Sequence, residues 1–164
     1  MTIFNVLFVD DEFANDPPVK DYFANQEYTP LGLFQSLADV TYSGCHKLFI
    51  SRFVTCALTL DLKVHLVFAN SGDRAVNAVQ ENSFHLVFVD YNMNGEKGTK
   101  VTERLIEENS ELYIVGWTSD DGREEKFKNA GAQDCFEKWA RNEKITELLS
   151  ALKEQVDNSP KCMM

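Results

Sequence analysis

Five short apolar runs, separated by segments with the period of helices, constrain this sequence more than any other feature. Runs rich in Val, Ile, Leu and Phe are typical of strands covered on both faces. Four runs are clear, and the fifth carries charges that suit the edge of a sheet. The expected strands are residues 3–9, 64–69, 84–89, 113–117 and 134–138.

Apolar residues between these runs recur at spacings of three and four, the pattern of helices with one buried face. The helical stripes lie at residues 45–60, 75–79, 101–106, 121–129 and 145–156. Gly131 follows the fourth stripe and suits a left-handed cap at a helix end. Strand and helix therefore alternate five times, which predicts a parallel sheet with helices on both faces. We expect an α/β, doubly wound, five-stranded sheet with the flavodoxin-like order 2-1-3-4-5.

The alternation uses nearly all of the 164 residues, so we expect one domain over residues 1–156 and a flexible tail over 157–164. Residues 13–43 do not fit the alternation, because a loop between strand and helix usually takes about 2–6 residues. This segment carries prolines but also six aromatic residues, which is too many for a solvated linker. We therefore expect an ordered insertion, packed onto its own domain, with a short helix near residues 19–24.

The charge balance excludes several classes of function. There are 26 acidic and 16 basic residues, for a net charge of −10, which argues against binding to nucleic acid or to an anionic membrane. The first residues lack the basic region of a signal peptide, and no apolar run is long enough to span a membrane. Four cysteines without metal or redox spacing are typical of reduced thiols. We expect a cytoplasmic protein that is a monomer or a weak dimer.

Polar residues stand where the expected strands end, the place at which doubly wound sheets bind ligands. The residues at these ends are Asp10 and Asp11, Asp90, Thr118 and Lys138. Because the carboxyl ends of parallel strands meet at one edge, we expect these side chains to converge.

Such a convergence has chemical consequences. Carboxylates within ~5 Å of each other repel by about 3 kcal/mol per pair at an effective dielectric of 20, so the cluster needs a cation. Oxygen ligands with open water positions suit Mg²⁺ better than Ca²⁺. Lys138 and Thr118 offer donors to a phosphoryl oxygen, and Asp90 is then an attacking carboxylate whose product is an aspartyl phosphate.

With these residues in place, the chain resembles the receiver domain of two-component response regulators. The segment FNVLFVDDE resembles the first strand of the family with its acidic pair, and HLVFVDYNMNGEKG resembles the phosphoacceptor strand and loop. IVGWTS resembles the strand that carries a hydroxyl, and NAGAQDCFEK resembles the run into the family's lysine.

The resemblance implies a role for each residue of the cluster. Asp90 is the implied phosphoacceptor, and Thr118 and Lys138 are implied to hold the phosphoryl oxygens. The implied ligands of a Mg²⁺ cofactor are Asp10 (through water), Asp11, Asp90 and the backbone carbonyl of Asn92.

Other positions either match the family or depart from it. Gly98 matches the glycine that lets the loop after the phosphoacceptor turn into the next helix. Asn94 and Trp139 stand where the family usually has proline, and Cys135 occupies the position of its aromatic switch residue.

These observations predict a single-domain response regulator that takes a phosphoryl group on Asp90 from a phosphohistidine of a sensor kinase or phosphotransfer protein. It would catalyse only its own phosphorylation and dephosphorylation, and signal through a downstream effector protein or act in a phosphorelay. The alternative is a pseudo-receiver that signals by protein contacts without phosphorylation. A flavin protein or an aspartate phosphatase is disfavoured, because no phosphate cradle follows the first strand and no D-x-D-x-T motif is present. We expect His46, His65 and His85 to be structural or surface residues.

Overall fold

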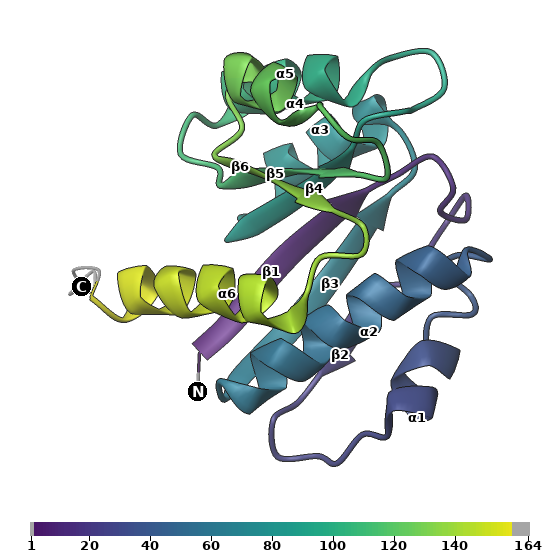
Figure 1. The fold of residues 1–164 in the computed structure, drawn as a ribbon, viewed down its shortest axis with the longest axis vertical. Helices are drawn as coiled ribbons and strands as arrows, with labels where there is room; N and C mark the ends of the chain where they lie inside the picture. Colours follow the sequence, from purple (N-terminus) through teal and green to yellow (C-terminus); the bar gives the residue numbers. More distant parts are fainter. Residues whose placement is uncertain (1, 159–164) are drawn as a thin grey trace.

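A computed structural model describes residues 2–158 and shows a six-stranded sheet between two layers of helices (Figure 1). The strand order is β2-β3-β1-β4-β5-β6. Five strands are parallel, and β2 is antiparallel to its neighbour β3. The strands are β1 (Thr2–Val9), β2 (Lys20–Tyr22), β3 (Leu62–Ala69), β4 (Leu86–Asp90), β5 (Ile114–Thr118) and β6 (Asp134–Glu137).

The helices divide between the two faces of the sheet. In Figure 1, α2 and α6 cover one face, while α3, α4 and α5 cover the other, and α1 lies outside α2. The helices are α1 (Pro30–Gln35), α2 (Gly44–Thr59), α3 (Gly72–Glu81), α4 (Gly98–Glu108), α5 (Glu124–Ala130) and α6 (Asn142–Asp157).

Each face of the sheet has its own apolar core. The core under α2 and α6 is aromatic, with Phe8 stacked on Phe88 at 4.8 Å between ring centroids and edge-on to Phe53 at 5.8 Å. The core under α3, α4 and α5 is built mainly from aliphatic residues. Every residue of β4 and β5 is buried, as the continuous apolar runs predicted for strands covered on both faces.

The parallel strands follow the predicted order, because β3-β1-β4-β5-β6 is the order 2-1-3-4-5 of the five expected strands. The predicted number of strands is wrong, since the insertion adds β2 to the edge of β3. Three residues are too short for a periodic signal in the sequence. The strand forms because the edge of β3 offers it free backbone groups to pair with.

The short helix expected near residues 19–24 is also wrong, because residues 20–22 form β2. Asp21 faces outward and contacts His65 at 2.7 Å, while Tyr22 points into the core, which is the alternation of a strand. A helix does form later in the insertion, as α1. Thr29 caps it by accepting from Gly32 N, and Pro30 occupies its first turn, where proline needs no amide partner.

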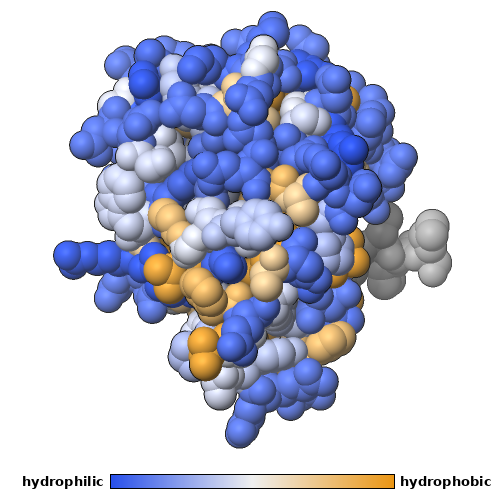
Figure 2. Space-filling view, turned by 90° about the vertical axis from the view of Figure 1, so that its right-hand side faces the viewer, coloured by the Kyte–Doolittle hydropathy of each residue, from blue (hydrophilic) through white to orange (hydrophobic). Residues whose placement is uncertain are grey.

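The two ends of the insertion are held together. Phe13 and Thr41 form an antiparallel bridge, and Ala14 N donates to Val40 O at 2.8 Å. Phe13 is buried edge-on to Phe68, with 5.2 Å between centroids. The insertion therefore packs onto its own domain. Figure 2 shows that the apolar surface on this side is broken into small patches, mostly in the lower half where α1 and α2 lie.

Gly131 ends α5 with a φ of 112°, the predicted left-handed cap. Cys45, Cys56 and Cys135 are free thiols, and Cys162 lies outside the described residues. Most of the expected tail, from residue 159 onward, also lies outside them. Within residues 2–158, no helix combines the length and apolarity that a membrane crossing requires.

Candidate functional site

Three aspartates meet at the carboxyl ends of the two central strands. β1 and β4 are neighbours in register, with Val9 paired to Val89, so the residues that follow them emerge side by side. Carboxylate oxygens of Asp10, Asp11 and Asp90 all lie within 4.8 Å of one another. The predicted convergence of acidic residues is therefore present in the fold.

Lys138 reaches this cluster from the edge of the sheet that β6 forms. It follows β6, and its amide donates to Thr118 O at 2.9 Å, which fixes the start of the side chain. Its ammonium lies over the ring of Trp117, with Nζ 4.7 Å from the ring centroid. Nζ ends 2.8 Å from Asp10 Oδ2 and 3.0 Å from Asp90 Oδ1. Lys138 thus binds carboxylates on both central strands while only 6% exposed.

The charges of the cluster act on each other strongly, because it is buried. Burial, with the negative charges of Asp10 and Asp11, raises the pKa of Asp90 to about 6, although Lys138 opposes the shift. Burial also acts to raise the pKa of Asp10, but the ammonium of Lys138 stabilises the charged carboxylate, and the pKa is lowered. Burial alone would lower the pKa of Lys138, yet the charges of Asp10 and Asp90 raise it. Lys138 is therefore a stable cation, and Asp90 is the strained carboxylate.

The cluster fits a hard divalent cation. Its three carboxylates and one ammonium leave two negative charges uncompensated. All of the acidic ligands are oxygens, the donor type that Mg²⁺ takes. Asp11 is oriented by Asn94 N, which donates to Oδ2 at 2.8 Å, and it is more exposed than Asp10 and Asp90. Asp11 and Asp90 could hold Mg²⁺, with water completing the coordination.

The other two predicted site residues point elsewhere. Thr118 ends β5 next to Asp90, but its hydroxyl accepts from Asp120 N at 3.0 Å rather than contacting the carboxylates. The side chain of Asn92 donates to Asp120 Oδ2 at 2.7 Å and accepts from Lys97 at 3.3 Å. The metal-binding role of the Asn92 carbonyl stays a prediction, as does the phosphoryl contact of Thr118.

Gly98 brings the loop after β4 back against the cluster. Its amide donates to Tyr91 O at 2.9 Å, and a Cβ at this position would overlap the carbonyl oxygen of Asp90. Only glycine allows so close an approach of α4 to the end of β4. The structure thus gives a steric reason for glycine at this position.

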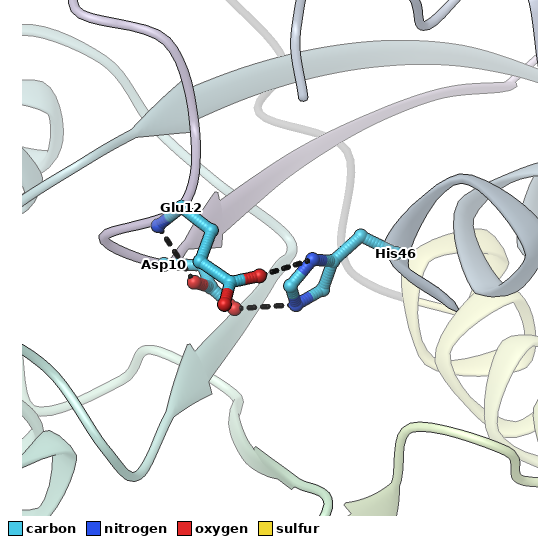
Figure 3. A group of neighbouring side chains, drawn as sticks. All are labelled: Asp10, Glu12 and His46. Atoms are coloured by element: carbon cyan, nitrogen blue, oxygen red, sulfur yellow. Dashed lines mark hydrogen bonds and ion pairs between the residues drawn. The ribbon is translucent and has the colours of Figure 1, made fainter. Parts of the chain in front are cut away.

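His46 is a site residue that the sequence did not reveal. It lies in the first turn of α2, 2% exposed, with Nε2 2.8 Å from Asp10 Oδ2 and Nδ1 3.2 Å from Glu12 Oε2 (Figure 3). It has no second ligand three or four residues away in the sequence, because its partners lie on other elements. A usable signal was its place at the start of the first long helical stripe after β1, because such a helix begins beside the strand ends. His65 and His85 have structural contacts, with Asp21 and with the amide of Asn5.

Comparison with protein families gives a match over most of the chain. The model of the response regulator receiver domain matches residues 46–150, which is more than half of the 164 residues. The match begins after the insertion, so the acidic pair of β1 lies outside it, and the fold brings that pair back to the site. A search of curated proteins found no match.

Solved receiver domains share the fold. A CheY-like receiver domain protein from Methanospirillum hungatei JF-1 is 15% identical, with a TM-score of 0.59 over 96% of this chain and 100% of that one. The BeF3-activated DrrB receiver domain is 18% identical, with a TM-score of 0.57 over 94% and 99%. TrrA from Thermotoga maritima, in complex with Mg(2+)-BeF, is 15% identical, with a TM-score of 0.56 over 91% and 98%. With the family match over residues 46–150, the chain belongs to the response regulator receiver domain family.

Proposed function

We propose that this chain is a phosphoacceptor of a two-component system, which takes a phosphoryl group on Asp90 from a phosphohistidine with the help of Mg²⁺. The donor would be a sensor kinase or a phosphotransfer protein in the cytoplasm. The observation that carries the proposal is the buried ammonium of Lys138, 3.0 Å from Asp90 Oδ1, beside carboxylates with two uncompensated negative charges. This is an arrangement for stabilising charge on a transferring phosphoryl group.

The transfer itself is a displacement at phosphorus. A carboxylate oxygen of Asp90 forms the new P–O bond, and the P–N bond of the donor breaks, with its electron pair staying on the histidine nitrogen. Mg²⁺ held by Asp11 and Asp90 would neutralise charge on the transferring oxygens. Lys138 then leaves Asp90 Oδ1 and binds a phosphoryl oxygen instead. The hydroxyl of Thr118 leaves Asp120 N and donates to a second phosphoryl oxygen. TrrA was solved in complex with Mg(2+)-BeF, and a metal beside a phosphoryl-like group would also fit the acidic site of this chain.

The signal would pass to protein partners. A phosphoryl group adds about −1.5 to −2 charges at the end of β4. This charge attracts the hydroxyl of Thr118, which then loses its contact with Asp120 N. The loop that leads into α5 changes as a result. The surface formed by α5, β6 and α6 would then bind an effector protein, or the phosphoryl group would pass onward in a relay.

Intact-mass measurement tests the proposal. Incubation with Mg²⁺ and acetyl phosphate should add the mass of one phosphoryl group, and Asp90→Asn should abolish the addition. Asp121→Asn is the matched control, because it removes an exposed aspartate from the neighbouring loop after β5. If no donor produces an adduct, the alternative of a pseudo-receiver that signals without phosphorylation is favoured.

A further inference from the structure

His46 contacts the ammonium of Lys138 as well as the acidic cluster. Its Nε2 lies 2.7 Å from Lys138 Nζ and 2.8 Å from Asp10 Oδ2. The backbone amide of His46 donates to Ser43 Oγ at the start of α2, and the buried ring lies 5.0 Å from the ring of Trp117 between centroids, so the side chain has little room to move. Figure 3 shows the carboxylates of Asp10 and Glu12 on the same side of the ring, each facing one ring nitrogen.

The donors and acceptors around the imidazole determine whether Nε2 donates or accepts a hydrogen bond. A lysine ammonium has three N–H donors, and burial makes an unpaired donor costly. Within the described residues, Lys138 has three acceptors at bonding distance, which are Asp10, Asp90 and His46 Nε2. Asp10 does not need a proton from His46, because Oδ1 already accepts from Glu12 N at 3.0 Å and Oδ2 accepts from Lys138.

The charge that faces the other ring nitrogen favours the same assignment. Nε2 offers either one proton or one lone pair, so it can donate to Asp10 or accept from Lys138, but not both. If it accepts, the ring proton is on Nδ1, which faces the carboxylate of Glu12 at 3.2 Å. If it donates, the lone pair of Nδ1 faces that carboxylate and one N–H of Lys138 loses its acceptor. Nδ1 is buried, and its contact with Glu12 lacks the geometry of a hydrogen bond, so it has no hydrogen-bond partner within the described part of the chain.

We infer that His46 is a positioning residue, which accepts a hydrogen bond from Lys138 at Nε2 and thereby holds the ammonium over the phosphoacceptor. The inference rests on the proposed function, because the role of Lys138 there is to bind a phosphoryl oxygen. The flexible side chain of lysine has several rotamers, and most of them place the ammonium away from the phosphoacceptor. A contact that favours the productive rotamer therefore keeps the ammonium in place. When Lys138 leaves Asp90 Oδ1 for the phosphoryl oxygen, the contact with His46 keeps the ammonium in the pocket. His46 itself need not touch the phosphoryl group.

A double-mutant cycle tests this role. His46→Leu should slow phosphorylation by acetyl phosphate at saturating Mg²⁺ by about tenfold, as expected for loss of one positioning contact. In the Lys138→Met background, the same change should alter the residual rate by less than about twofold, because the group that it positions is gone. His46→Gln should recover part of the rate, since its amide oxygen can accept from Nζ. Equal slowing in both backgrounds would show a merely structural histidine and overturn the inference.

Matched controls separate positioning from folding. His85→Leu removes a histidine at the other end of the sheet, where it accepts from the amide of Asn5, and should leave the rate unchanged. Thermal unfolding of each variant shows whether it is folded at the assay temperature. If His46→Leu does not fold, the phosphorylation rates of His46→Gln and His46→Phe are compared instead. A Phe variant that is phosphorylated as fast as the Gln variant would refute the hydrogen bond.

A spectroscopic measurement is independent of phosphorylation. Long-range ¹H–¹⁵N spectra of the unmodified protein should show the proton of His46 on Nδ1, and Lys138→Met should shift the Nε2 resonance. A proton on Nε2, or an unchanged resonance in the variant, would overturn the inference even if phosphorylation is normal. If the resonance shifts but the wild-type protein accepts no phosphoryl group, the proposed function fails and the contact stands.

Discussion

Replacing Asp90 by Asn tests whether the acidic cluster strains the fold when no metal is bound. Asp90 is 6% exposed, and burial together with Asp10 raises its pKa from 3.8 to about 6. A carboxyl group whose pKa is higher in the folded state than in the unfolded state destabilises the fold once it is ionised. Asn keeps the shape of the side chain and an oxygen that can accept from Lys138, but it removes the charge.

The magnitude follows from the shift. A rise from 3.8 to about 6 corresponds to about 3 kcal/mol at 1.36 kcal/mol per pKa unit. The folded protein binds the proton of Asp90 more tightly than the unfolded chain, so stability falls as the pH rises between these two values. Asp90→Asn has no such loss. Its free energy of unfolding should therefore exceed that of the wild type by up to about 3 kcal/mol at pH 7, and by progressively less toward pH 4.

Urea unfolding in the presence of a chelator, at several pH values from 4 to 7, measures this difference. Added Mg²⁺ should narrow the gap at pH 7, because the cation stabilises the folded wild type by binding it. Asp121→Asn removes an exposed carboxylate and should change the free energy of unfolding little. A gap that does not change with pH, or an Asp90→Asn variant less stable than the wild type at pH 7, would refute the reasoning.

Three further perturbations have defined outcomes. Titration with Mg²⁺ should change the fluorescence of Trp117, because Lys138 lies over its ring and shifts when metal takes the carboxylates; Trp139→Phe should keep that change, and a flat titration would count against the site. Gly98→Ala should lower the free energy of unfolding by about 2 kcal/mol or more in urea, through overlap with the end of β4, and an unaffected variant would contradict the steric argument. Phe13→Ala should cost about 3–5 kcal/mol in the same assay, and a loss below about 1 kcal/mol would show that the insertion is not anchored there.

The acidic cluster could be predicted because it depends only on topology. Once the chain alternates strand and helix in parallel, the residues after β1 and β4 must emerge together, whatever their separation in sequence. Lys138 follows from the same rule, since β6 ends at the same edge. Rotamers are not fixed by topology, which is why Thr118 lies at the expected strand end but bonds to Asp120.

His46 and the insertion could not be predicted in the same way. The role of His46 depends on where α2 begins and on which of its faces packs against the sheet; Ser43 marks the beginning by capping the helix three residues earlier. The strand of the insertion depends on a tertiary partner, the edge of β3, which overrides the weak local preference of residues 20–22. The helix of the insertion did have a local signal, because Thr29 followed by Pro30 is a typical helix start.

The antiparallel strand β2 also covers part of an exposed sheet edge. Without it, the whole length of β3 would present unpaired amide and carbonyl groups, a template on which a second chain could extend the sheet. With it, that side of the domain ends in a strand of only three residues, preceded by two prolines that have no amide hydrogen to donate. The insertion thereby occupies residues 64–66 of β3, which leaves less free backbone at this edge for sheet extension.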